Sequence, residues 1–297
     1  MDAYLPKAHI MTVKKVKSRT AHESSGTRGA NELKARWERL HRTDREPWPD
    51  EALIAREAAA APAFAEWLRH YGSGRKLAAA LQAAWGAFHA GEFAAAIEQG
   101  APLGALGACV ANRAAAVESL YTDAGNAEVM ELLLAAVARG EEAVQILAAH
   151  ANAHYTLALV LGRYSQRISI LKAITDGLAG RVRAELERTL ELEPQHAEAH
   201  VALGLYNAEI VNKLGNVVAS LTYGASSKES IQHFKHAVKL APHSPIVHME
   251  YAYGLLLLNG ERYREEAEAL YKTAAATEPL DAMEALDVER AKRGLPQ

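Results

Sequence analysis

From residue 51 to the C-terminus, apolar residues recur every three or four positions with charged residues between them. This spacing is typical of amphipathic α-helices, and it differs from the strict alternation of a half-buried strand. It predicts helices over residues 51–71, 76–90, 92–99, 104–121, 126–149, 152–172, 177–192, 197–213, 227–241, 245–258, 262–277 and 281–292. Glycines between these segments favour helix ends and tight turns. The chain is therefore predicted to be all-α.

The first 50 residues differ from the rest of the chain. Residues 1 to about 30 are rich in charge, serine and glycine with little to bury, which predicts disorder. A short helix is expected over 31–41, after which Pro47 and Pro49 bar helix continuation and Asp50 supplies an N-cap. We expect a disordered, partly helical leader over 1–50, with Met11 as an alternative start, and a helical repeat domain over 51–297.

An internal repeat organises the helical part. The segment at residues 150–158 matches the segment at 196–204 at five of nine positions with an offset of 46 residues, and a third copy lies at 245–252. Repeats of this size are typical of arrays in which each helical hairpin shares its core with its neighbours.

The helices ahead of the repeated segments share a second pattern: a small residue, an aromatic residue four later, a small residue three later and a proline five later. It is met by Ser230, Phe234, Ala237 and Pro242, and again by Ala267, Tyr271, Ala274 and Pro279. Small residues let two helices approach closely, and the aromatic ring fills the space toward the next unit.

This pattern resembles the tetratricopeptide repeat. The resemblance implies an all-α superhelix of helical hairpins, clearest over residues 150–280 and ending in a solvating cap helix at 281–293. The chain is similar to a group of bacterial tetratricopeptide proteins and, more distantly, to the tetratricopeptide component of tripartite (TRAP) transporters.

The array is irregular. The interval from Pro194 to Pro242 is 48 residues long and that from Pro242 to Pro279 is 37, whereas a repeat of this family has about 34. The surplus of the first interval includes the apolar stretch 214–224, an insertion in a central repeat. We expect so apolar a stretch to pack on something.

The resemblance also implies which side chains line the concave groove, because the first helix of each unit faces that side. The implied groove residues are Asn152, Tyr155, Leu159, Arg163, Glu198, Val201, Leu205, Glu209, Met249, Tyr253 and Leu256. A mostly apolar groove fits a partner helix or an extended peptide, with Arg163 and Glu209 fixing its orientation. The alternative is that the 214–224 insertion folds into the groove and that these residues are ordinary core.

Other candidate chemistry is weak. His150 with His154, and His196 with His200, have the spacing of four that zinc-binding helices use, but no further ligand stands nearby in a recognised pattern. We therefore expect no metal site and no cofactor. The sequence contains no HExxH, GxSxG, phosphate-loop or dinucleotide-binding motif, so we expect no catalytic residues and no enzyme.

Composition narrows the classes of partner. With 33 Lys and Arg against 36 Asp and Glu, the net charge of −3 does not indicate nucleic-acid binding. The longest uncharged stretch, 144–162, contains Gln145, Asn152 and two histidines and is not expected to insert in a membrane. The N-terminus lacks the apolar run of a secretory signal, and Cys109 alone cannot form an intramolecular disulfide, which together favour the cytoplasm.

The sequence thus predicts a non-catalytic scaffold or adaptor that binds a peptide or protein segment in a concave helical groove. The alternative is a protein that binds a small apolar molecule beneath a roof formed by residues 214–224. The sequence leaves open the identity of the partner and the oligomeric state.

Overall fold

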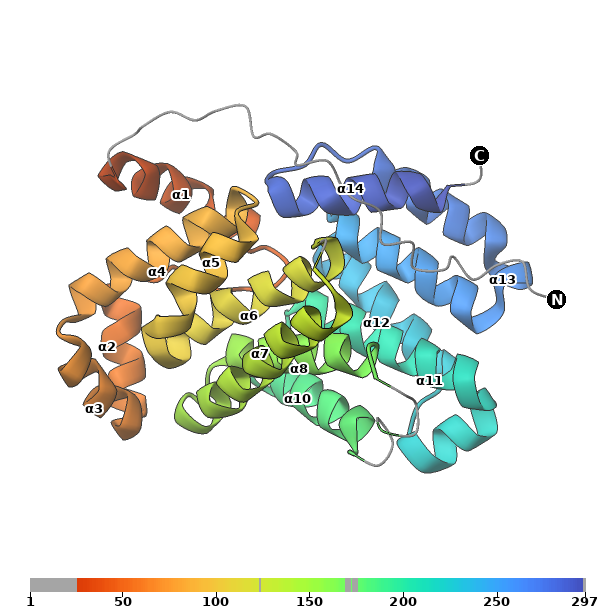
Figure 1. Ribbon diagram of the computed structural model, residues 1–297. Helices are drawn as coiled ribbons and strands as arrows, with labels where there is room; N and C mark the ends of the chain where they lie inside the picture. Colours follow the sequence, from red (N-terminus) through yellow and green to blue (C-terminus); the bar gives the residue numbers. More distant parts are fainter. Residues whose placement is uncertain (1–25, 123, 169–171, 173–175, 296–297) are drawn as a thin grey trace.

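The computed structural model describes residues 26–295 except for 123, 169–171 and 173–175. Within these residues every regular element is a helix, which confirms the predicted all-α class (Figure 1). The helices are α1 Gly26–Leu40, α2 Glu51–Ala60, α3 Pro62–Tyr71, α4 Gly74–His89, α5 Phe93–Gly100, η1 Ala101–Leu103, α6 Gly104–Tyr121, α7 Asn126–Ile146, α8 Ala151–Ser165, α10 Leu178–Leu192, α11 Ala197–Tyr223, α12 Ser227–Leu240, α13 Pro245–Ala275 and α14 Ala282–Gly294.

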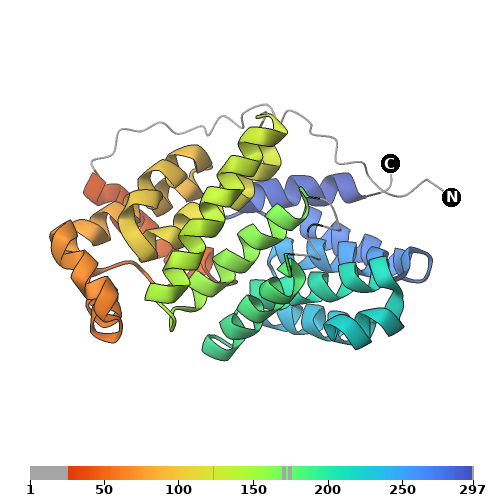
Figure 2. The same cartoon turned by 60° about the horizontal axis from the view of Figure 1, so that its bottom comes forward.

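The helices form a superhelix of stacked hairpins. The pairs α4 and α5, α6 and α7, α8 and α10, and α11 and α12 follow one another, and each pair packs on the next (Figures 1 and 2). The connections within the pairs α4 and α5, α6 and α7, and α11 and α12 are three or four residues long, so these helices run antiparallel, as in other helical hairpins. The predicted superhelix is thereby confirmed.

Two long helices contain the turns that the sequence predicts. In α13, Asn259 leaves helical geometry with φ −167° and ψ 92°. The hydroxyl of Tyr251 donates to Glu266 at 3.2 Å, although fifteen residues of straight helix would separate them by about 22 Å. The two halves of α13 therefore fold back on each other as a hairpin. In α11 the break lies at Gly215, whose φ of 75° suits glycine.

The ring of Phe234 packs as the small-aromatic-small pattern predicts. Phe234 is fully buried between Gly204 in α11 and Gly254 in α13. A β-carbon at either glycine would come within 2.8 or 2.4 Å of the ring. The hydroxyl of Ser230 donates to the carbonyl of Gly204 at 2.7 Å, which holds α12 close to α11. One aromatic ring thus joins two successive hairpins.

The predicted boundary at residue 50 is wrong, because the body of the protein begins earlier. Residues 1–25 of the predicted leader lie outside the described residues, and α1, which ends at Leu40, covers all but the last residue of the helix expected over 31–41. Trp37, His41, Asp44 and Glu46 are each no more than 6% exposed. We name residues 41–50 the plug segment, since it is packed inside the superhelix. Its charges are paired with residues far along the chain, which local patterns of polarity do not register.

The C-terminal helix packs against the array through part of its surface. The helix itself is present as α14, but Asp287, Val288 and Ala291 on it are buried. α14 packs along α13 and also touches the end of α4, so the array closes on itself (Figure 1). A β-carbon at Gly91 would meet Ala282 at 2.9 Å, so this contact is close.

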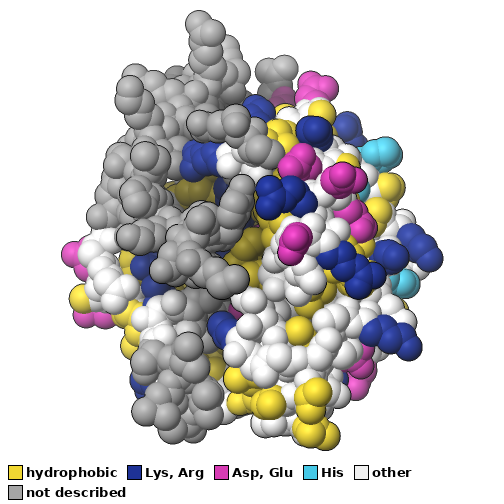
Figure 3. Space-filling view, turned by 90° about the vertical axis from the view of Figure 1, so that its right-hand side faces the viewer, with side chains coloured by type: hydrophobic (Ala, Val, Ile, Leu, Met, Phe, Trp, Pro, Cys, Tyr) yellow, Lys and Arg dark blue, Asp and Glu magenta, His cyan; other side chains and the backbone are white. Residues whose placement is uncertain are grey.

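The apolar insertion does not fold into the groove. Residues 216–223 form the second half of α11 and project from the molecule, where Leu214, Val217, Val218 and Leu221 are 37%, 73%, 49% and 83% exposed. Figure 3 views this side, with apolar side chains gathered at its lower edge. Only Ala219 of this stretch is fully buried. Both the insertion-filled groove and the roof of the alternative hypothesis are therefore wrong.

Among the described residues, one helical stretch is long and apolar enough to cross a membrane. This stretch runs from Phe93 to Tyr121, and 56% of its most apolar window is buried inside the fold. The core helix of a soluble protein meets the same criterion, so the stretch is weak evidence for a membrane span.

We expect Gly254→Ala to lower the free energy of unfolding by about 1–3 kcal/mol, because the added methyl group overlaps the ring of Phe234. Gly86→Ala is the matched control. Gly86 lies inside α4 with nothing within 4 Å of the added carbon, so its replacement should raise stability by up to about 1 kcal/mol. Urea unfolding measures both, and equal effects of the two substitutions would contradict this account of the packing.

Candidate functional site

The concave side of the superhelix is occupied by the chain's own plug segment. The side-chain amide of Asn152 donates to the carbonyl of Asp44 at 3.0 Å, and the backbone amide of Glu198 donates to the carbonyl of Thr43 at 3.1 Å. Trp37 holds the other side of the segment by donating from Nε1 to the carbonyl of Glu46 at 2.7 Å. Two of the predicted groove residues, Asn152 and Glu198, therefore bind a peptide backbone, but this backbone belongs to the same chain.

The local backbone explains how the plug segment presents two buried carboxylates. Residues 41–44 form a turn, and Arg45 takes a left-handed conformation with φ 56°. Arg45 is exposed, whereas Asp44 and Glu46 on either side of it are buried. A non-glycine residue in this conformation is held there by its surroundings, here the contacts of its two neighbours.

Arg113 on α6 is the centre of a buried ion-pair network. Its Nη2 donates to both oxygens of Glu198 at 2.7 Å and lies 3.3 Å from Oδ2 of Asp44. The hydroxyl groups of Tyr155 and Thr43 donate to the same Glu198 carboxylate at 2.8 and 2.5 Å. The guanidinium also lies over the ring of Tyr155, 5.5 Å from its centre. One glutamate thus joins α6, α8, α11 and the plug segment.

A chain of polar contacts continues from this network to the C-terminal helix. His41 Nδ1 lies 2.9 Å from Asp44, and its Nε2 lies 3.1 Å from Nε2 of His89. His89 Nδ1 in turn lies 2.7 Å from Asp281, the N-cap of α14. Arg42 forms an ion pair with Glu284 in the first turn of the same helix. The plug segment therefore also positions α14.

Burial and pairing shift the pKa values in opposite directions within the network. Burial alone would raise the pKa of Asp44, but His41 and Arg113 outweigh it and hold this pKa well below its usual value. Burial lowers the pKa of His89 and of His196. Burial also raises the pKa of Asp287 well above its usual value. Burial and pairing thus favour an ionised Asp44 and the neutral forms of His89 and His196.

A small cavity with both polar and apolar walls lies where these groups meet. It has a volume of about 40 Å³, and its walls include His41, Arg113, Glu198 and Asp287. A volume of this size holds a few water molecules. A second, more open cleft of about 420 Å³ lies between α10, α11 and α12, with Arg183, Asn207 and His233 among its lining residues. Neither cavity is lined by residues 214–224.

Three predicted groove residues remain at the open end of the concave face. Tyr253 is 37% exposed, while Arg163 and Glu209 are partly buried. Burial lowers the pKa of Arg163 and raises the pKa of Glu209, and the two charges attract each other. Nε of Arg163 is buried without a hydrogen-bond partner. This end of the groove therefore offers an aromatic ring, a cation and an acid.

The other predicted groove residues are part of the hydrophobic core. Val201 and Met249 are buried, and Leu205 and Leu256 pack against the same cluster around Phe234. Leu159 lies between the clusters that α8 forms with α7 and with α10. Val201 and Met249 are therefore covered by neighbouring hairpins, whereas Leu159, Leu205 and Leu256 are only partly buried, and their place in a groove stays a prediction.

The histidine pairs do not converge as zinc ligands. His154 lies 2.6 Å from Glu185, while His150 faces Glu57 and Glu46. His196 bonds Asn152 at 3.0 Å, and His200 lies 2.9 Å from His233. In each pair the first residue lies at the N-cap and the second inside the helix, and the two imidazoles point to different neighbours.

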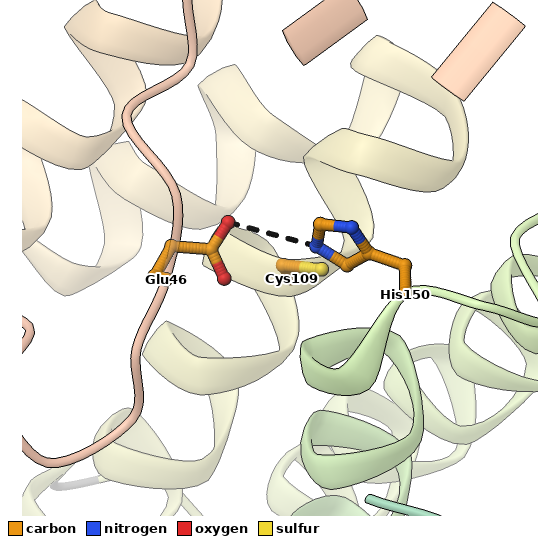
Figure 4. Close-up of side chains that lie close together, drawn as sticks. All are labelled: Glu46, Cys109 and His150. Atoms are coloured by element: carbon orange, nitrogen blue, oxygen red, sulfur yellow. Dashed lines mark ion pairs between the residues drawn. The ribbon is translucent and has the colours of Figure 1, made fainter. Parts of the chain in front are cut away.

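A different group brings potential metal ligands together in the core. Glu46, Cys109 and His150 come from the plug segment, α6 and the N-cap of α8, and their ligand atoms all lie within 4.8 Å of one another (Figure 4). Nε2 of His150 lies 3.8 Å from Glu46, and its Nδ1 lies 3.5 Å from Glu57 on α2. Burial opposes the charged form of His150, but Cys109, Glu46 and Glu57 raise its pKa well above the usual value. Burial raises the pKa of the Cys109 thiol.

Several of these residues cannot be found from sequence patterns. Asp44, Glu46 and Arg113 belong to no recognised motif, and the residues that they pair with across the fold lie 69 to 108 positions away. The sequence offers one signal: Trp37 lies just before the polar segment 41–50, and Trp48 lies within it. Tryptophan is a large apolar residue that is usually buried, so a packed segment was foreseeable there.

Residues 109–252 are similar to a protein family described as Regulator of microtubule dynamics protein 1-3. The matched range, just under half of the 297 residues, begins in α6 and ends in the first half of α13. It includes every predicted groove residue except Tyr253 and Leu256. No curated protein sequence matches the chain.

We expect Asp44→Asn to lower the free energy of unfolding at pH 7 by about 3–5 kcal/mol, because it removes one partner of a buried ion pair. The folded-state pKa of Asp44 lies below its ordinary value of 3.8. Its contribution is therefore present above about pH 4 and is lost as the pH falls further. Urea unfolding between pH 7 and 3 should show the variant and the wild type converging in acid.

Glu191→Gln serves as the control for Asp44→Asn. Glu191 pairs with Arg188 on the surface, where the side chains are 64% and 43% exposed, and such pairs contribute at most about 1 kcal/mol. Equal stability of Asp44→Asn and wild type at pH 7 would show that the network does not stabilise the plug segment.

Proposed function

We propose that this protein is a non-catalytic scaffold or adaptor that binds an extended peptide or protein segment on the concave face of its helical array. The observation that supports the proposal most directly is that this face already binds ten residues of its own chain. The partner is a protein of unknown identity, and the cytoplasm remains the expected compartment.

The internal complex illustrates the recognition chemistry that the face provides. Asn152 and the backbone of Glu198 each donate to a carbonyl of the plug segment, and such bonds to main chain do not depend on the bound sequence. Side chains then add selectivity, since Glu198 accepts from Thr43 and Arg113 attracts Asp44. An extended segment with small polar and acidic side chains is thus the kind of ligand that these helices accommodate.

The open end of the groove is the part available to a partner. Arg163, Glu209 and Tyr253 continue the concave side beyond the plug segment, and the partly exposed guanidinium of Arg163 can pair with a peptide carboxylate. Tyrosine is enriched at the centres of protein interfaces because its ring buries apolar area at little entropic cost. A peptide that meets all three would be oriented by the opposite charges of Arg163 and Glu209.

Two resemblances support a protein partner. The small-aromatic-small spacing around Phe234 resembles the tetratricopeptide repeat, an architecture associated with peptide recognition, and we propose membership of that group. The family matched by residues 109–252 is named for regulating microtubule dynamics. Regulation of a protein assembly would be consistent with the function of a scaffold.

The alternative function, binding of a small apolar molecule, stays a prediction. The roof that it requires is missing, because residues 214–224 project away from the groove. The 40 Å³ cavity is small and has Arg113, Glu198 and Asp287 among its lining residues, whereas pockets for such ligands are mostly apolar and about 300–1,000 Å³ in volume.

Selection of a random peptide library displayed on phage against the full chain tests the proposal. We expect enriched peptides whose binding, measured by fluorescence anisotropy, weakens about 10-fold or more in Tyr253→Ala. Tyr263→Ala is the matched control, since Tyr263 lies beyond the turn at Asn259, on the second half of α13, and should leave Kd unchanged. Absence of enriched peptides, or equal binding by Tyr253→Ala, would overturn the assignment.

A further inference from the structure

We propose that Glu46, Cys109 and His150 form a zinc-binding site that fastens the plug segment to the helical body. The three side chains are each no more than 6% exposed, and they come from three segments distant in sequence. They supply one carboxylate, one thiol and one imidazole. These are the donor types that bind Zn²⁺ in proteins.

The distances suit a zinc ion after small movements. Zinc bonds of about 2.0–2.3 Å in tetrahedral geometry place neighbouring ligand atoms roughly 3.3–3.8 Å apart. Nε2 of His150 and Oε1 of Glu46 are already 3.8 Å apart, and all the ligand atoms lie within 4.8 Å of one another. Shifts of about 1 Å or less in side-chain position would complete the three bonds, and a water molecule can take the fourth position, as in other zinc sites with three protein ligands.

The unpartnered nitrogen of His150 points independently to a ligand. Nε2 of His150 is buried and has no hydrogen-bond partner, although buried polar atoms are nearly always paired. It is also the ring nitrogen nearest the Glu46 carboxylate in Figure 4. A metal bound at Nε2 would satisfy this atom.

Glu57 stands where a supporting residue of a zinc site is expected. Histidines that bind metal usually donate their other ring nitrogen to a carboxylate, which fixes the ring. Nδ1 of His150 lies 3.5 Å from Glu57, and Glu57 is in turn held by Arg56 at 2.9 Å. Replacement of one proton on the thiol and one on the imidazole by Zn²⁺ would leave the charge of the cluster unchanged, so binding requires no additional counter-charge in the core.

Titration of the metal-free full-length protein with Co²⁺ tests the site, because cobalt bound to a thiolate gives a charge-transfer absorption band. We expect saturation at one equivalent and loss of the band on addition of Zn²⁺. We also expect zinc at about 100 times Kd to raise Tm by about 5 °C. Circular dichroism before and after metal removal verifies that the protein remains helical.

Four substitutions make the test specific. Cys109→Ala, a small apolar replacement for a buried thiol, should abolish the band and the rise in Tm while leaving the helical signal unchanged. Glu46→Gln and Glu57→Gln should weaken cobalt binding at least about 10-fold, with the band retained. His233→Gln removes one member of the separate His200, His233 and His236 group, and it should leave the thiolate band intact.

The outcomes separate cleanly. A helical wild-type protein that shows no thiolate-to-cobalt band would overturn the assignment, as would a band that Cys109→Ala retains or binding that Glu46→Gln leaves unchanged. Cobalt binding without a charge-transfer band, abolished by His233→Gln, would place the metal on the surface histidines and would also overturn it.

Discussion

The structure depends on the burial of charge at Arg113. A guanidinium inside a helical core is stable only if carboxylates surround it, since an unpaired buried charge is far more costly than any single hydrogen bond. Glu198 comes from the repeat array and Asp44 from the plug segment. The ion pair therefore requires that residues before position 50 be inside the superhelix. The ion pair thus orders the plug segment, which would otherwise be solvated.

The array and the plug segment stabilise each other by different means. Between hairpins, apolar contacts such as that of Phe234 with Gly204 and Gly254 need only small residues at the right spacing. On the concave side the contacts are ionic and directional, and they join elements at both ends of the chain through His41, His89 and Asp281. The result is an array whose ends meet, unlike an open solenoid in which each repeat contacts only its neighbours.

This closure shapes the function that we propose. The deep part of the groove is occupied by the chain itself, so recognition of a partner is left to the shallower end around Arg163, Glu209 and Tyr253. The plug segment is held at several points, and the cluster of Glu46, Cys109 and His150 adds a further one. A binding surface built beside so rigid a segment is largely preformed, which lowers the entropic cost of binding.

The sequence by itself determined the helices, most of their ends and the way in which hairpins pack, because these depend on interactions within a few turns of helix. The 3.6-residue period, the glycines at turns and the spacing of Ser230, Phe234 and Ala237 are all local signals. Only the tertiary structure decided what fills the groove. The partners of Arg113 and His150 lie far away along the chain, and the sequence around a single charged residue does not indicate which residue it pairs with. From the sequence alone, a polar segment such as 41–50 is therefore predicted to be solvated. Its burial becomes evident only when the tertiary structure brings the residues of opposite charge next to it.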